Sequence, residues 1–303
     1  MAAWVFWTLL TIVSWGIWAI LSKLIGDELS PAHSQVISTI GIVPIIGMLW
    51  LSKDAEPTRN LRRGVWLAIA SGIISCLGNI AYYDVLNRGS KAAAVIPITA
   101  LYPTVTVLLA VPILKERLTA VQLVGVGLSL VAIYLFNVTA EQGVFTSWLL
   151  FALIPIALWG VCGLLQKMST NYISARTSAI WFLAAFLPVA GIIMFSEPLP
   201  AGVSIRTWAL AMALGFTLAL GNFTILLAFS SGGKASIIAP LAGLYPLVSI
   251  PIAMAVLGER MSWREEWREL LGMACALVAV VLLSLQSQSD TPKETTDQPR
   301  TLP

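Results

Sequence analysis

Residues 78–117 read GNIAYYDVLNRGSKAAAVIPITALYPTVTVLLAVPILKER, and residues 221–260 read GNFTILLAFSSGGKASIIAPLAGLYPLVSIPIAMAVLGER. At this offset of 143 residues, 14 of the 40 positions are identical. The identities keep glycine, proline, tyrosine and charged positions, whereas most apolar residues differ. Further upstream, Trp15-Gly16 pairs with Trp159-Gly160 at an offset of 144. The chain therefore contains an internal duplication.

The composition points to a lipid bilayer as the solvent of this chain. Its 303 residues are 58% hydrophobic and 11% charged, with a mean hydropathy of +0.86, whereas soluble domains carry about 25% charged residues. One soluble core of this size could not hold so much apolar sequence. The net charge of +3 is spread among apolar stretches, which argues against a nucleic-acid partner.

Ten stretches are apolar over about 20 residues and are predicted to span the membrane. They are residues 4–25, 33–52, 64–86, 90–112, 119–137, 147–167, 176–195, 206–229, 234–257 and 269–286. The first lacks a basic start, which favours a membrane helix over a cleaved signal peptide. Residues 287–303 are polar and rich in proline and threonine, so we predict a disordered tail.

Each copy of the duplication holds five spans, the first at residues 1–140 and the second at residues 141–286. Because five is odd, the second copy enters the membrane from the opposite side. The sequence thus predicts an all-α integral membrane fold of ten transmembrane helices in two inverted five-helix repeats. With the N-terminus inside, 11 Lys and Arg residues lie in inner segments and 6 in outer loops, which predicts that both termini are cytoplasmic.

The tandem repeat, the ten spans, the early Trp-Gly and the paired Leu-Tyr-Pro and Glu-Arg marks together resemble the drug/metabolite transporter superfamily. The similarity is greatest to its two-repeat EamA-type members, and its most typical mark is the Glu-Arg pair at Glu116 and at Glu259. It implies a carrier whose central cavity is lined mainly by spans 1, 3, 4, 6, 8 and 9. It also implies movement of small polar metabolites, with amino-acid export as the first expectation and sugar or nucleotide-sugar uptake as the alternative.

Paired residues within the spans are the candidate substrate contacts. Asn79 and Asn222 occupy equivalent places in spans 3 and 8, where a carboxamide either bonds across helices or faces substrate. Tyr102 and Tyr245 lie near mid-span, which favours the cavity over an interfacial anchor. The other candidates are the repeat partners Trp15 and Trp159, the recurring prolines Pro97 and Pro240, which are expected to bend spans 4 and 9 around the cavity, and Tyr82 and Tyr83, which have no aromatic counterparts.

Five charged residues are candidates for gating or coupling: Lys23, Asp84, Glu116, Lys167 and Glu259. Lys23 and Lys167 end spans 1 and 6, where they either snorkel to the interface or reach back into the cavity. Asp84 is placed for a helix-surface ion pair with the arginine four residues later, and is also the leading acid for proton coupling. The two glutamates act either as a latch or as caps of the following helix.

The sequence carries no sign of an enzyme or a cofactor. It has no GxxxxGK[ST] motif for ATP-driven pumping, a single histidine, and three cysteines without metal-ligand spacing. The expected partners are the lipid bilayer of a bacterial inner membrane and a small-molecule substrate, and coupling is either absent or to a proton or another ion. A homodimer stays open, as does a receptor or structural protein that shares the fold without transporting.

Overall fold

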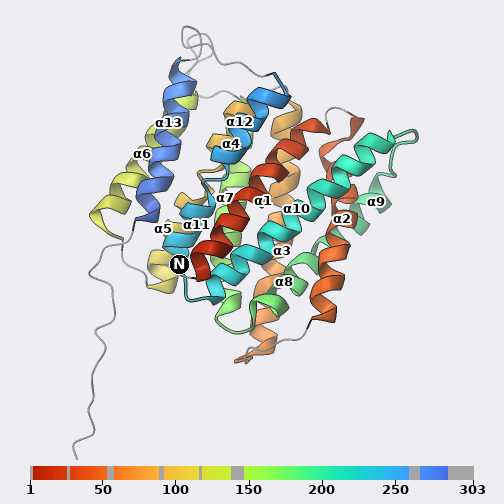
Figure 1. The fold of residues 1–303 in the computed structure, drawn as a ribbon, viewed down its shortest axis with the longest axis horizontal. Helices are drawn as coiled ribbons and strands as arrows, with labels where there is room; N and C mark the ends of the chain where they lie inside the picture. The colour runs from red at the N-terminus through yellow and green to blue at the C-terminus, as the bar shows by residue number, and fades with distance from the viewer. Residues whose placement is uncertain are drawn as a thin grey trace, which may run out of the picture.

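The computed structural model describes residues 3–25, 28–52, 58–88, 92–115, 118–137, 147–258 and 267–285. Within them the fold is helical, as expected from the apolar stretches (Figure 1). The helices are α1 (Ala3–Leu24), α2 (Pro31–Leu51), α3 (Leu61–Asn87), α4 (Ala92–Thr99), α5 (Tyr102–Leu114), α6 (Ala120–Asn137), α7 (Ser147–Thr170), α8 (Ala175–Ala184), α9 (Phe186–Ser196), α10 (Ile205–Ser230), α11 (Ala235–Ala242), α12 (Pro246–Val256) and α13 (Trp267–Ser284).

Eight helical stretches in the described residues are long and apolar enough to cross a membrane. Three of them consist of two consecutive helices: α4 with α5, α8 with α9, and α11 with α12. The apolar parts of α6 and α13 are shorter, at Ala120–Ala132 and Leu270–Leu283. The all-helical fold is thus confirmed for the described residues, with eight candidate membrane spans, whereas the count of ten spans and their inverted arrangement stay predictions.

The breaks in the predicted fourth and ninth spans lie at equivalent places in the two repeats. The α4 helix ends at Thr99 and α5 opens with Tyr102-Pro103, while α11 ends at Ala242 and α12 opens at Pro246. Proline lacks the N–H of a continuing helix but fits the first turn of a new one. The break therefore belongs to the Leu-Tyr-Pro mark that the repeats share.

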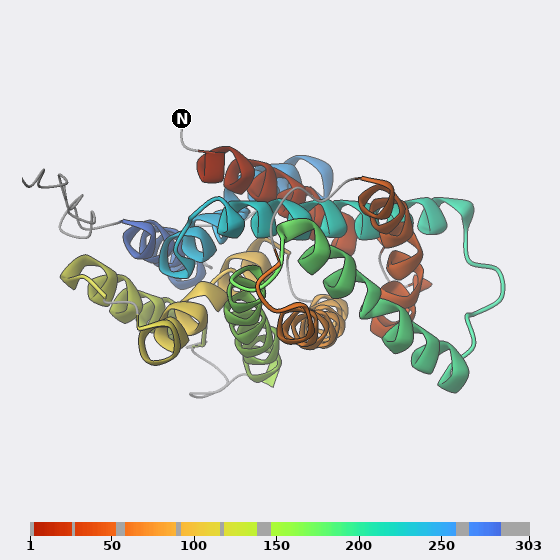
Figure 2. The same ribbon diagram turned by 90° about the horizontal axis from the view of Figure 1, so that it is seen from below.

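Helices of the two repeats are interleaved in the fold. The α1 helix lies along α10, and α3 lies along α7, so the first helix of each repeat contacts the third long helix of the other. Figure 2 shows these pairs, red with teal and orange with yellow-green, in the upper and lower parts of the molecule. Glycine permits close contacts between the repeats: a side chain at Gly16 would collide with Val248, and one at Gly160 would collide with Val105.

The loop after the first helix of each repeat also contacts the other repeat. The carboxylate of Glu28, which follows α1, accepts a hydrogen bond from Thr207 Oγ1 at 2.6 Å at the start of α10. The backbone oxygen of Tyr172, which follows α7, accepts from Arg59 N at 2.8 Å just before α3. The first contact uses an ionisable side chain and the second uses only backbone atoms.

Candidate functional site

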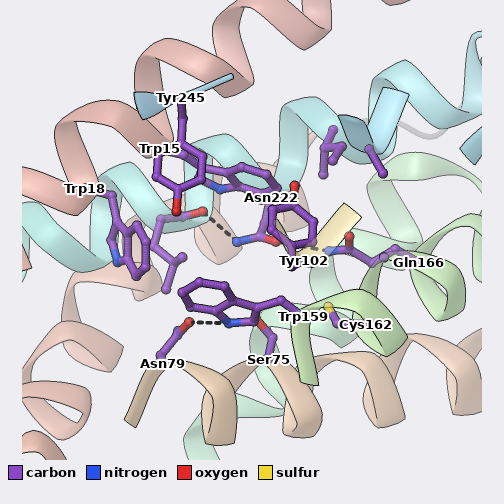
Figure 3. A pocket seen from close by; sticks show the side chains of 14 residues that line it. Trp15, Trp18, Ser75, Asn79, Tyr102, Trp159, Cys162, Gln166, Asn222 and Tyr245 are labelled. Atoms are coloured by element: carbon purple, nitrogen blue, oxygen red, sulfur yellow. Dashed lines mark hydrogen bonds between the residues drawn. The ribbon is translucent and has the colours of Figure 1, made fainter. Parts of the chain in front are cut away.

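A cavity of about 40 Å³ lies between the two repeats (Figure 3). Its walls come from α1, α3, α5, α7, α10 and α11, together with Tyr245. These elements belong to spans 1, 3, 4, 6, 8 and 9, the six spans that the family resemblance implies. The lining residues are Trp15, Trp18, Ser75, Asn79, Tyr102, Trp159, Cys162, Gly163, Gln166, Leu218, Asn222, Ile225, Ala239 and Tyr245. The space is large enough for about three water molecules.

Both repeats contribute equivalent residues to the cavity wall. Three pairs of sequence candidates lie there together: Trp15 with Trp159, Asn79 with Asn222, and Tyr102 with Tyr245. The ring of Tyr102 meets both indoles edge to face, and its centroid lies 6.2 Å from that of Trp15 and 6.2 Å from that of Trp159. None of the lining residues, all from the described part of the chain, is a lysine, arginine, aspartate, glutamate or histidine. The wall is therefore aromatic, with neutral polar groups.

The two asparagines form different hydrogen bonds. Asn79 Oδ1 accepts from Trp159 Nε1 at 3.2 Å, a bond between the repeats. Asn222 Oδ1 accepts instead from Gln166 Nε2 at 3.0 Å, and its Nδ2 donates to the backbone oxygen of Leu218 at 2.9 Å. Both asparagines thus bond across helices and lie in the cavity wall, and contact with substrate stays a prediction.

Tyr82 and Tyr83 lie behind the cavity wall. The ring of Tyr82 stacks on Trp18 with centroids 5.0 Å apart, and it also contacts Trp159 at 5.3 Å. Trp18 Nε1 donates to the hydroxyl of Tyr83 at 3.3 Å. Neither tyrosine is among the lining residues, so in this conformer they support the indoles that are.

Pro97 and Pro240 are buried within α4 and α11 and do not line the cavity. The helix breaks lie a few residues later, before Pro103 and at Pro246. A proline in the first turn of a helix needs no backbone partner, which is why the chain breaks there. The recurring prolines do mark broken spans beside the cavity, but the first of each pair is not where the helix ends.

The two lysine candidates do not line the cavity. Lys23 Nζ donates to the backbone oxygen of Leu86 at 3.2 Å, and Lys167 Nζ donates to those of Phe229 at 3.2 Å and Gly233 at 2.9 Å. Leu86 and Phe229 lie in the last turns of α3 and α10, where carbonyl groups lack helical partners. Both lysines therefore bind helix C-termini, which also favour positive charge.

The acidic candidates divide into one surface residue and two that lie outside the described residues. Asp84 Oδ2 accepts from Arg88 Nε at 2.8 Å, and these side chains are 37% and 44% exposed, which confirms the helix-surface ion pair. Glu116 and Glu259 lie outside the described residues. Near the start of α10, hydrogen bonds from Thr207 and Ser204 hold the pKa of Glu28 below its usual value.

Sequence reasoning missed several lining residues, above all Trp18, Cys162 and Gln166. A signal for Gln166 was present, because a glutamine inside an apolar span needs a polar partner. Cys162, one of the three cysteines without metal-ligand spacing, lies in the wall with 5% of its surface exposed. No pattern in the chain distinguishes it from an ordinary buried cysteine.

Comparison with known proteins agrees with this architecture. The chain is 28% identical over 131 residues to the uncharacterized protein MJ1333.1 of Methanocaldococcus jannaschii, a match that covers 43% of this chain and 93% of that protein. The relative is thus about as long as one repeat. A protein of known crystal structure covers 92% of this chain and 96% of its own length with a TM-score of 0.62 at 18% identity, which shows a shared fold.

The family comparison is the most specific. A model of the EamA-like transporter family matches residues 2–138 and matches again over residues 146–285. Two matches in tandem cover nearly the whole chain and agree with the resemblance drawn from the repeated Leu-Tyr-Pro and Glu-Arg marks. The chain therefore belongs to the EamA-like transporter family of the drug/metabolite transporter superfamily, whose members are membrane transporters.

Proposed function

We propose that the protein is a secondary transporter that carries a small metabolite through the cavity by alternating access. The observation that carries the proposal is the cavity itself, because its wall is built from equivalent residues of two interpenetrating repeats. Duplicated halves around a central site are the usual arrangement in such carriers. Ten crossings in two inverted repeats, with both termini cytoplasmic in an inner membrane, complete the proposed topology.

Alternating access requires this small cavity to widen toward one side at a time. The breaks before Pro103 and at Pro246 adjoin Tyr102 and Tyr245, so movement of α5 or α12 would change the wall directly. Non-helical backbone inside a membrane protein is tolerated where protein or a water-filled cavity satisfies it. The two broken spans are therefore the proposed moving elements.

The proposed substrate is an amino acid or a related metabolite that is exported, with sugar or nucleotide-sugar uptake as the alternative. A wall of indole and phenol rings with neutral polar groups suits an apolar body with a small polar end. Coupling to a proton would use Asp84, Glu116 or Glu259, and a homodimer remains part of the proposal to be tested.

The deciding experiment is flux in liposomes containing the purified protein. Uptake and efflux of labelled amino acids, sugars and nucleosides would be measured with and without a pH gradient. Transport that is lost in Tyr102→Ala or Tyr245→Ala, while Leu187→Ala on the exposed side of α9 stays active, is the expected result. Flux that is unchanged in both tyrosine variants would refute the site, and ligand binding without any flux would favour a non-transporting relative.

A further inference from the structure

Three polar atoms in the cavity wall are buried and have no hydrogen-bond partner. They are Trp15 Nε1, Asn79 Nδ2 and the hydroxyl oxygen of Tyr102. Asn79 and Tyr102 are 1% and 5% exposed, so water outside the protein does not satisfy them. A buried polar group without a partner lowers stability unless a ligand or an ordered water binds it. All three belong to the first repeat, and Figure 3 shows them around one space.

The equivalent atoms of the second repeat are all bonded within the protein. Trp159 Nε1 donates to Asn79 Oδ1 at 3.2 Å, and Asn222 Nδ2 donates to Leu218 O at 2.9 Å. The hydroxyl of Tyr245 lies 3.4 Å from both Thr99 Oγ1 and the backbone oxygen of Ile96. The three atoms of the second repeat are therefore all paired, two of them with groups of the first repeat, whereas their counterparts in the first repeat have no partner.

Gln166 accounts for the unpaired indole. By symmetry, Trp15 Nε1 would donate to Asn222 Oδ1, because each indole nitrogen lies against the glycine that precedes the equivalent asparagine. Asn222 Oδ1 is already bound by Gln166 Nε2 at 3.0 Å. The residue equivalent to Gln166 in the first repeat is Ser22, whose hydroxyl donates within its own helix, to Ala19 O at 2.6 Å. The longer side chain thus competes with Trp15 for this oxygen, whereas Trp159 has no such competitor for Asn79 Oδ1.

A second difference accounts for the unpaired phenol. Tyr245 has Thr99 as a hydroxyl neighbour. At the offset of 143, the position equivalent to Thr99 is Ala242, which has no hydroxyl. The hydroxyl partner that Tyr245 has is therefore missing at the equivalent position for Tyr102. Two residue differences between the repeats therefore leave two donors unpaired in the same wall.

From this asymmetry we infer that Trp15, Asn79 and Tyr102 form a polar subsite for a carbonyl or carboxylate oxygen of the carried molecule. The inference rests on the proposed carrier function and names the part of the substrate that the first repeat binds. An indole N–H and a carboxamide NH₂ only donate, so the ligand group must accept. Gln166 is a positioning residue, since it acts by keeping Trp15 Nε1 available.

The test follows the indole N–H resonance of Trp15 in the full chain, in lipid nanodiscs with isotope-labelled tryptophan. Its loss in Trp15→Phe identifies the resonance. Acetate, acetamide and ethylammonium are the probes, because they are similar in size, fit a small cavity, and differ in that ethylammonium has no acceptor. Acetate and acetamide should move the Trp15 resonance, and ethylammonium should not.

Gln166→Ser gives the second repeat the residue of the first and provides the sharpest comparison. It should move the Trp15 resonance without any probe, because Asn222 Oδ1 becomes free to accept. It should also weaken acetamide binding by about three- to tenfold, the effect of one neutral hydrogen bond. Ser22→Ala, which alters the equivalent position in the first repeat, is the control and should leave the resonance in place.

The subsite would be overturned if acetate and acetamide leave the Trp15 indole resonance unchanged, or if ethylammonium moves it equally. So would a Gln166→Ser resonance identical to that of the wild type. Flux separates this outcome from failure of the carrier proposal. Probe binding at Trp15 in a protein that moves no solute would overturn transport and keep the subsite, whereas flux that is unaffected by Trp15→Phe and Gln166→Ser would overturn the subsite and keep transport.

Discussion

Replacing Trp159 by phenylalanine removes a bonded indole N–H, whereas the same change at Trp15 removes one without a partner. Trp159 Nε1 donates to Asn79 Oδ1 at 3.2 Å, and its loss leaves a buried acceptor unpaired. A hydrogen bond between membrane helices contributes about 0.6 kcal/mol on average, and an unsatisfied buried group costs about 1–3 kcal/mol. Because the bond is long, we expect Trp159→Phe to lower the free energy of unfolding by about 1 kcal/mol more than Trp15→Phe.

The comparison is matched because both changes remove the same atoms from repeat-equivalent positions on the same cavity. The loss of ring volume therefore largely cancels in the difference. Reversible unfolding of each variant in mixed micelles, titrated with dodecyl sulfate, measures the two free energies. Equal destabilisation, or a greater loss in Trp15→Phe, would show that the pairing asymmetry has no energetic consequence.

Three further outcomes are expected from contacts outside the cavity. The pKa of Glu28 in the folded protein lies below the ordinary pKa of 4.5. The hydrogen bond from Thr207 to the Glu28 carboxylate therefore stabilises the fold above pH 4.5, and this stabilisation is lost as the pH falls through the lowered pKa. The higher thermal stability of the wild type over Glu28→Gln should accordingly vanish in acid. Gly160→Ala should lower the free energy of unfolding by about 1–3 kcal/mol through overpacking, whereas Gly191→Ala, where a side chain meets open space, should not; similar melting curves would contradict the close packing. Lys167→Met should lower it by about 1 kcal/mol because the last turn of α10 loses a charged donor, and an unchanged unfolding midpoint would exclude that role.

The positions of the helices followed from the sequence to within a few residues, because apolar length and polar breaks decide where a chain crosses a membrane. The broken spans were expected from paired prolines, but the place of each break was not. Pro97 and Pro103 both lie in the predicted fourth span and cannot be told apart by sequence, but only Pro103 lies at the start of a helix. Whether a proline bends a helix or starts one depends on how the freed carbonyl groups are satisfied by neighbouring segments.

The candidate site was predictable where the repeats agree and unpredictable where they differ. The pairs containing Trp15, Asn79 and Tyr102 stood out because they recur, and all of them line the cavity. The duplication gives no hint that Gln166 competes for Asn222, since that competition depends on side-chain reach across a helix interface. Lys23 was placed correctly at a helix end, yet its binding of the α3 C-terminus requires the tertiary arrangement.

The difference between Ser22 and Gln166 has a consequence for how a solute is oriented. A cavity formed by two identical copies of one half would present every group twice, so an asymmetric solute could enter in two equivalent poses. A single chain that carries both halves is free to place different residues at equivalent positions. Here the polar atoms of the second half are paired, two of the three with groups of the first half, and their counterparts in the first half are not. Fusion of the halves thus turns a site with two equal poses into one with a distinguishable head and tail.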